Sequence, residues 1–222
     1  ISGDGMGGDL YLVKLDGDLA RLGIVQVVDD DPPTNDMFLV GGQGAIYVGK
    51  FLPGTGHRVY PLDLYQYQDI PPLFAQIARE VGRLDGLFHA AGITQIMSTK
   101  LLTDEDFENV FGTSLKAAFS LIRGFSHRDV RHAHGSSFVL MSSTQAMKGV
   151  SGSAAYGASR AGMLGATRNW AVELASLKIR VNSIVAGLVK TPMEEHLKGV
   201  LPPANSEGNA RAYPLGIGEA ED

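Results

Sequence analysis

The sequence contains no cysteine among its 222 residues, which excludes a disulfide framework and thiol chemistry. No apolar run approaches the roughly 20 residues that a membrane-spanning helix needs, and no signal-peptide pattern is visible. The formal net charge is −5 and no long basic run occurs, so neither nucleic acid nor a membrane is an expected partner. These absences are compatible with a reducing compartment, and we expect a cytoplasmic protein.

The residues that are present suit a globular protein. Hydrophobic residues make up 44% of the chain, enough for one domain with a sizeable core, and we expect residues 1–222 to form a single domain. The chain does not begin with Met, and Ile1-Ser2-Gly3 resembles the end of a strand. We therefore expect a chain trimmed at both ends; a natural short variant is the alternative.

Helical and strand patterns alternate along the chain. Periodicity predicts helices over residues 10–22, 70–81, 107–122 and 156–174, and apolar runs predict strands over residues 24–28, 58–62, 84–88, 138–141 and 179–185. This alternation predicts an α/β fold with a parallel sheet flanked by helices. Residues 32–56 are ambiguous, because residues 37–40 suit either a strand or part of a helix.

One group of polar residues indicates a reaction site. Ser142-Ser143 follows an apolar strand, and Tyr156 and Arg160 follow four positions apart, so these two side chains share one helix face. A fixed positive charge favours the phenolate form of a nearby tyrosine. A serine hydroxyl beside them can hold a carbonyl oxygen, and the group can pass a proton to or from a carbonyl or alcohol.

These residues resemble the short-chain dehydrogenase/reductase family, in which a Ser lies thirteen positions before Tyr-x-x-x-Lys. Ser143 and Tyr156 keep that spacing, while Arg160 replaces the lysine. Residues 84–93 and 179–193 are similar to two further family segments. The resemblance implies a three-layer, doubly wound Rossmann fold and includes a weak similarity to 3-oxoacyl-carrier-protein reductases.

By this resemblance, four catalytic positions fall on Ser114, Ser143, Tyr156 and Arg160. Ser114 stands where the family has an asparagine that positions a water. Arg160 keeps the positive charge, but guanidinium is larger and effectively never deprotonated. We therefore expect hydride transfer to remain possible. The two replacements, Ser114 for asparagine and Arg160 for lysine, should mainly affect how protons are supplied to the site.

A nicotinamide dinucleotide is the cofactor that the resemblance implies. The N-terminal glycine loop is Gly3-Asp4-Gly5-Met6-Gly7-Gly8, and its tight turns would bring the pyrophosphate to the N-terminus of the predicted first helix. Asp29 lies at a suitable distance to bind a ribose 2′-hydroxyl, which favours NAD over NADP. The expected cofactor-binding residues are Gly3, Gly5, Gly8, Asp29, Asp63, Leu64, His89, Ala90, Ala91, Gly92, Tyr156, Arg160, Gly187, Val189 and Thr191.

A second glycine run, Gly41-Gly42-Gln43-Gly44, is a rival for this role. We prefer the N-terminal loop, since the rival leaves too few residues between Asp63 and His89 for another helix and strand. No metal is expected. His127, His132 and His134 crowd one segment, and a solvated loop is the better interpretation of them.

Two functions are consistent with these residues. The first is an NAD(P)-dependent oxidoreductase acting on a small carbonyl or secondary alcohol. The second is a catalytically impaired member that senses a dinucleotide or serves as a partner subunit. By resemblance we expect a homodimer or homotetramer. If Arg160 only acidifies Tyr156 and holds ribose, Arg160→Lys preserves cofactor binding and restores or raises turnover, which is the outcome that the sequence favours. If the site is rebuilt around the guanidinium, lysine loses a contact.

Overall fold

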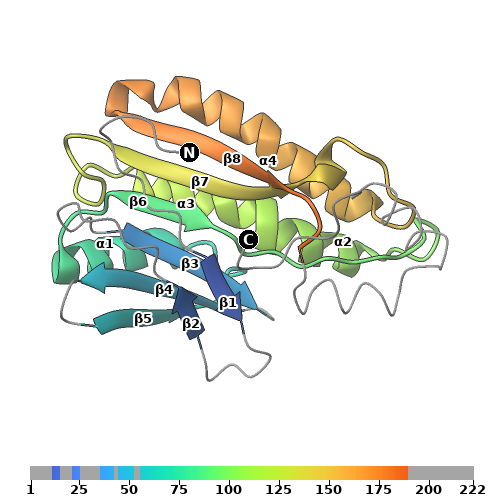
Figure 1. The fold of residues 1–222 in the computed structure, drawn as a ribbon, viewed down its shortest axis with the longest axis horizontal. Coiled ribbons are helices and arrows are strands. Elements are labelled where there is room, and N and C mark those ends of the chain that lie inside the picture. Colours follow the sequence, from blue (N-terminus) through green and yellow to red (C-terminus); the bar gives the residue numbers. More distant parts are fainter. Residues whose placement is uncertain (1–11, 16–21, 26–35, 43–44, 53–55, 190–222) are drawn as a thin grey trace. The chain divides into compact units, whose positions relative to one another are not determined.

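The computed structural model describes residues 12–15, 22–25, 36–42, 45–52 and 56–189 (Figure 1). The chain divides into two compact units, Ile1–Pro33 with Leu188–Asp222, and Thr34–Gly187. The single-domain expectation stays a prediction. None of the described helices combines the length and apolar character that crossing a membrane requires.

The first unit contains a two-stranded antiparallel hairpin. Strand β1 (Leu12–Leu15) pairs with β2 (Leu22–Val25), with Leu12 opposite Val25 and Leu15 opposite Leu22. The helix predicted over residues 10–22 is therefore wrong. Residues 12–15 and 22–25 pair as strands, which a continuous helix over this range would not allow. The strand predicted at 24–28 overlaps β2.

The second unit is built on a six-stranded sheet in the order β5-β4-β3-β6-β7-β8. The strands are β3 (Asp36–Gly42), β4 (Ala45–Leu52), β5 (Gly56–Leu62), β6 (Gly86–His89), β7 (Ser136–Ser143) and β8 (Ile179–Ala186). Strands β3, β6, β7 and β8 are mutually parallel, whereas β4 is antiparallel to both β3 and β5. The predicted α/β class with a parallel sheet is confirmed, and an antiparallel pair extends it.

The ambiguous residues 32–56 supply this antiparallel extension. Residues 37–40 belong to β3, and Gly42 pairs with Ala45 so that the chain reverses directly into β4. The strand predicted at residues 58–62 lies within β5, at the edge of the sheet. A helix between β3 and β5 would have allowed these strands to lie next to each other in parallel, and β4 takes that place instead.

The helices of the second unit lie along one face of its sheet (Figure 1). They are α1 (Ile70–Val81), α2 (Asp104–Phe111) and α3 (Ala117–Phe125), with a π-helical turn, η1 (Gly112–Lys116), between the last two, and α4 (Ala154–Glu173). Short 3-10 turns, η2 (Thr144–Ala146) and η3 (Ala175–Leu177), flank α4. The three helices predicted over residues 70–81, 107–122 and 156–174 are confirmed in position.

Local sequence explains where these helices begin and end. Proline occupies the first turn of α1, and Gly82, with φ of 88°, ends it. The Thr103 hydroxyl accepts from the Asp106 amide while the Asp106 carboxylate accepts from the Thr103 amide. This reciprocal capping box fixes the start of α2, and hence the register of η1 behind it.

The core lies between the sheet and its helices. Phe74, Phe125 and Phe138 are fully buried, and their rings pack in sequence from α1 through α3 to β7. Gly124 permits the close approach of α1 to α3, because a Cβ there would lie 3.0 Å from the Pro71 Cα. Burial of these large apolar groups stabilises the layer of helices on which the site depends.

Candidate active site

The candidate site lies at the carboxyl edge of the parallel strands. His89, the last residue of β6, pairs with Leu39 of β3 on one side and Leu140 of β7 on the other. Ser143 ends β7 opposite Ala186 of β8. Because parallel strands end at the same edge of a sheet, residues from four segments converge there.

The two serines at the end of β7 have different partners. The Ser142 hydroxyl donates to the Arg160 carbonyl at 3.0 Å, which ties β7 to α4. The Ser143 hydroxyl accepts from the Gln145 amide at 3.2 Å and caps η2. Since accepting one bond leaves its proton free, Ser143 remains able to donate to a carbonyl oxygen.

Tyr156 and Arg160 lie on one face of α4, as their spacing predicts. The Arg160 Cζ atom lies 4.9 Å from the centroid of the Tyr156 ring, within the range of a cation–π contact. Tyr156 is also buried beside Val110 and Ala155. The guanidinium therefore faces the tyrosine ring as a neighbouring positive charge.

Arg160 is itself held inside the protein. It is 3% exposed, and its Nη1 donates to the Met141 carbonyl of β7 at 2.6 Å, with the Met163 sulfur at 3.6 Å. Its Nε has no hydrogen-bond partner among the described residues. These contacts support a site built around the guanidinium, the alternative that the sequence did not favour.

Gly92 gives the guanidinium its space. A Cβ at this position would lie 2.2 Å from Arg160 Nη2 and 2.8 Å from Ser114 Oγ, distances that real Cβ contacts do not reach. The two polar groups thus both approach one backbone position, where any Cβ would require the ends of the Arg160 and Ser114 side chains to move. Ala91 beside it is buried, and Ala90 links it to β6.

Ser114 lies in η1 rather than in a regular α-helix. Its hydroxyl is fully buried without a hydrogen-bond partner among the described residues. Its carbonyl oxygen lies 2.8 Å from His89 Nε2. The predicted site residues from β6 and from the helix after it are therefore in direct contact.

His89 is the residue whose environment sequence reasoning missed. It was expected to bind cofactor, yet it is fully buried and bonded to η1. Burial, together with the nearby Arg160 charge, lowers the pKa of His89 from 6.5 to about 4. A histidine at the end of an otherwise apolar strand was the sequence feature that could have indicated this buried environment.

The remaining predicted cofactor residues have different surroundings where the structure describes them. Asp63 is exposed and accepts from the Tyr65 amide at 2.9 Å, whereas the Leu64 side chain is buried in the core. Gly187 is exposed after β8, and Val189 belongs to the first unit. The expected positions that lie outside the described residues are Gly3, Gly5, Gly8, Asp29 and Thr191.

The rival glycine run begins at the carboxyl edge where the site lies. Gly41 and Gly42 end β3, which is parallel to β6. Only α1 lies between β5 and β6. The number of residues after Asp63 is therefore sufficient, and it does not exclude the rival run as a cofactor loop. However, β4 follows it instead of a helix, so it offers no helix N-terminus for a phosphate.

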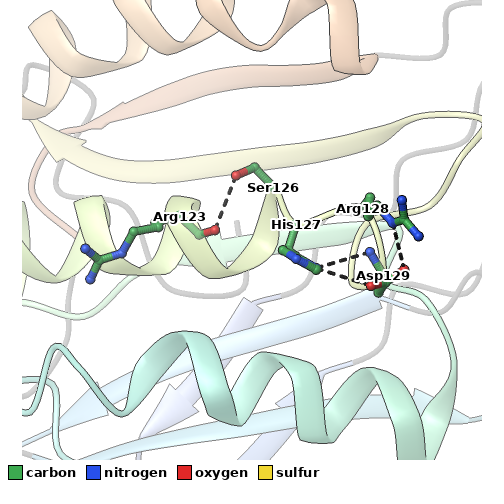
Figure 2. Close-up of polar contacts among 5 residues, drawn as sticks. All are labelled: Arg123, Ser126, His127, Arg128 and Asp129. Carbon is green, nitrogen blue, oxygen red and sulfur yellow. Dashed lines mark hydrogen bonds and ion pairs between the residues drawn. The ribbon is translucent and has the colours of Figure 1, made fainter.

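In the histidine-rich segment after α3, the side chains of His127 and Arg128 make exposed contacts. Figure 2 shows the Ser126 hydroxyl donating to the Arg123 carbonyl, and His127 and Arg128 both directed at Asp129. The Arg128 side chain is 84% exposed. Within the part of the chain that the structure describes, no cluster of His, Asp or Glu could hold a metal ion.

Comparisons with known proteins agree on the type of protein. A sequence profile described as Enoyl-(Acyl carrier protein) reductase matches residues 44–222. Carbonyl reductase family member 4 of Danio rerio is 31% identical over 174 residues, which cover 78% of this chain and 70% of that protein. The 3-oxoacyl-(acyl-carrier-protein) reductase FabG of Thermotoga maritima is 33% identical over 62% of this chain. The matched part spans 56% of the Thermotoga reductase.

A solved structure supports the fold. The short-chain type dehydrogenase/reductase of Mycobacterium ulcerans superimposes with a TM-score of 0.64 over 72% of this chain and 57% of that chain, at 24% identity. The α/β Rossmann fold predicted from the sequence is therefore confirmed by sequence profile and by shape, and the helices that the structure describes lie on one face of the sheet (Figure 1).

Proposed function

The chain belongs to the short-chain dehydrogenase/reductase family, and we propose that it is an NAD(P)-dependent oxidoreductase acting on a carbonyl or secondary alcohol. The observation that carries the proposal is the pairing of Tyr156 with a buried guanidinium in the helix that follows Ser143. A buried positive charge next to a phenol is costly to maintain for packing alone, and it suits proton transfer.

The residues at the carboxyl edge fit the nicotinamide half of the cofactor. The strand ends there carry Gly92 and a buried, unpartnered hydroxyl on Ser114, which leaves small and polar groups available to a ribose. Tyr156 and the Arg160 Nη2 group would hold that ribose, and Asp63 would lie towards the adenine. When bound, the nicotinamide ring supplies or accepts the hydride.

The side chains of this protein would perform the other steps. Ser143 would donate to the substrate oxygen and hold it in place. Tyr156 would give that oxygen a proton during reduction, or remove it during oxidation. Arg160, held by the Met141 carbonyl, would stabilise the phenolate that forms on Tyr156.

Replacement of Tyr156 tests this assignment. We expect Tyr156→Phe to abolish turnover of a carbonyl panel with NADH or NADPH while leaving the fold intact. Tyr60→Phe is the matched control. Tyr60, on β5, donates a hydrogen bond to Glu80 on α1, and neither residue belongs to the site. Nucleotide binding with no turnover by the wild-type protein would instead favour a non-enzymatic, dinucleotide-sensing subunit.

The choice of cofactor and substrate is a finer part of the proposal. Asp29 supports NAD over NADP because a carboxylate repels a 2′-phosphate, and tighter binding of NADPH in a titration would overturn it. The relatives named as 3-oxoacyl-(acyl-carrier-protein) reductases make a 3-oxoacyl thioester the first substrate to test. Sugars, steroids and simple ketones complete the panel.

Assembly and location complete the proposal. We propose a cytoplasmic homodimer or homotetramer that associates through α3 and α4. Phe119 on α3 and Val172 on α4 are exposed apolar side chains that support such a surface.

A further inference from the structure

We propose that His89 is a positioning residue of this active site, which fixes the π-helical turn carrying Ser114 through one hydrogen bond to the Ser114 carbonyl. The inference rests on the proposed function where it concerns turnover. It goes beyond that function because it assigns to His89 a role towards the protein and not towards the cofactor.

The backbone of η1 leaves a place for this bond. The Ala117 amide is shared between the Gly112 and Ser114 carbonyls, and the second lone pair of a carbonyl oxygen can accept a further donor. His89 Nε2 lies 2.8 Å from the same oxygen. It joins β6 to η1 across 25 positions of sequence, and π-helical turns of this kind occur frequently at functional sites.

The chemistry of the ring defines what His89 can do. A carbonyl oxygen only accepts, so Nε2 carries the proton. Since the pKa of His89 is lowered to about 4, Nδ1 carries a lone pair at neutral pH. Nδ1 is buried with no partner among the described residues. With its one proton held by a carbonyl, the ring positions η1 and does not relay protons.

Packing alone does not account for a histidine here. His89 is fully buried, and an unpaired buried acceptor opposes folding. An aromatic hydrocarbon side chain would fill similar space without that penalty. The ability of Nε2 to donate a hydrogen bond to the Ser114 carbonyl is therefore what histidine provides here and a hydrocarbon ring does not.

The bond places catalytic groups relative to one another. Ser114 Oγ and Arg160 Nη2 both approach the same point over Gly92, and Arg160 in turn faces Tyr156. A shift of η1 would move the Ser114 hydroxyl away from this meeting point. His89 thus acts on the reaction through Ser114 and Arg160.

Two variants separate the donor from the shape of the side chain. In His89→Gln the amide nitrogen can reach the position of Nε2, whereas His89→Phe keeps an aromatic ring without a donor. With NADH and a turned-over ketone, we expect His89→Phe to lower kcat by about tenfold or more and to change KM by less than about threefold. We expect His89→Gln to recover kcat to within about threefold of wild type. His127→Gln, on the exposed segment of Figure 2, is the unchanged control.

Amide hydrogen exchange tests the proposal without any turnover. We expect faster exchange over Gly112–Lys116 in His89→Phe and wild-type exchange in His89→Gln. Absence of turnover in the wild-type protein would defeat the proposed function and leave this measurement decisive for His89. Unchanged exchange in His89→Phe, or equal impairment of both variants, would overturn the proposal.

A double variant covers the case in which packing is disturbed. If His89 acts through Ser114, the effect of His89→Phe on kcat shrinks in a Ser114→Ala background. Full additivity of the two changes counts against the proposal. If His89→Phe is not recovered as a folded protein, His89→Leu takes its place in every measurement.

Discussion

Arg160 shows how one residue changes the interpretation of a site. Its charge is the feature that the sequence makes visible, but its hydrogen bond to the Met141 carbonyl and its fit against Gly92 depend on guanidinium shape. Lysine has a point charge on a flexible stem and cannot reproduce this arrangement. The interaction of Arg160 with the protein therefore limits what can replace it.

We expect Arg160→Lys to destabilise the fold by about 1–3 kcal/mol, because it weakens or removes the donor to the part-buried Met141 carbonyl. It also leaves unfilled space beside Gly92. The measurement is the free energy of unfolding from chemical denaturation. Arg168→Lys, at an exposed position of the same helix, should stay within about 0.5 kcal/mol of wild type. Equal stability of Arg160→Lys and wild type, with raised turnover, would restore the expectation drawn from the sequence.

His89 predicts a specific dependence of stability on pH. The unfolded chain takes up this proton near pH 6.5, whereas the folded protein, in which the pKa of His89 is about 4, does not. Protonation thus favours unfolding, so this contribution to stability is fully present above pH 6.5 and is lost as pH falls towards 4. The loss is at most roughly 3 kcal/mol.

Denaturation curves between pH 4 and 7 measure this effect. Arg160, from α4, is the charged group that acts on His89 among the described residues. We expect the free energy of unfolding to fall less steeply with decreasing pH in His89→Gln than in wild type. Parallel curves for the two proteins would show that His89 is not buried as a neutral ring.

At the scale of elements, the segment from α2 to α3 departs from its sequence pattern. The apolar spacing predicts one continuous helix over residues 107–122, and the structure widens it into η1 at Gly112–Lys116. Side chains from outside and inside the segment contact the residues next to this π-helical turn. The Tyr65 hydroxyl donates to the Asn109 carbonyl at 3.2 Å, and Lys116 forms an ion pair with Glu108.

Gly112 tests how tightly this turn is packed. A Cβ at Gly112 would lie 2.6 Å from Tyr65 Cε1 and 2.9 Å from the Tyr67 hydroxyl. We expect Gly112→Ala to lower the free energy of unfolding by about 1–3 kcal/mol through overpacking. In Gly165→Ala, by contrast, the added Cβ meets open space, so the change should raise stability by up to about 1 kcal/mol. Thermal unfolding of the two variants distinguishes these outcomes, and a neutral Gly112→Ala would show that the tyrosines adapt.

At the scale of the molecule, the helical face of the second unit carries exposed apolar side chains. Phe119 stacks edge-on against Trp170, and Val172 lies further along α4 with 81% of its surface exposed. Apolar side chains at adjacent helices form the kind of surface that symmetric oligomers bury.

We expect Val172→Asp to weaken the proposed oligomer by placing a charge in a buried contact. Sedimentation should show the mass of two or four chains for the wild-type protein and a larger fraction of single chains for the variant. Leu101→Asp, an exposed apolar position outside α3 and α4, is the control. A wild-type mass equal to one chain would contradict the expectation.

Local patterns predicted much of the second unit correctly. The period of α1, its prolines and the capping box of α2 are properties of neighbouring residues, and each is found as expected. The i, i+4 relation of Tyr156 and Arg160 is equally local, so their shared face on α4 could be predicted. The pairing of β1 with β2 was missed because the apolar residues over 10–22 also suit a helical period.

From the order of residues alone, the α/β class, the family and the shared helix face of Tyr156 and Arg160 could be predicted. The bond from His89 to η1, the approach of Arg160 to Gly92 and the position of β4 after the rival glycine run could be found only in the folded protein. The physical reason is separation along the chain. Periodicity reports on neighbours within a few residues, whereas the register of β6 against β3 and β7 brings together side chains that are tens of positions apart.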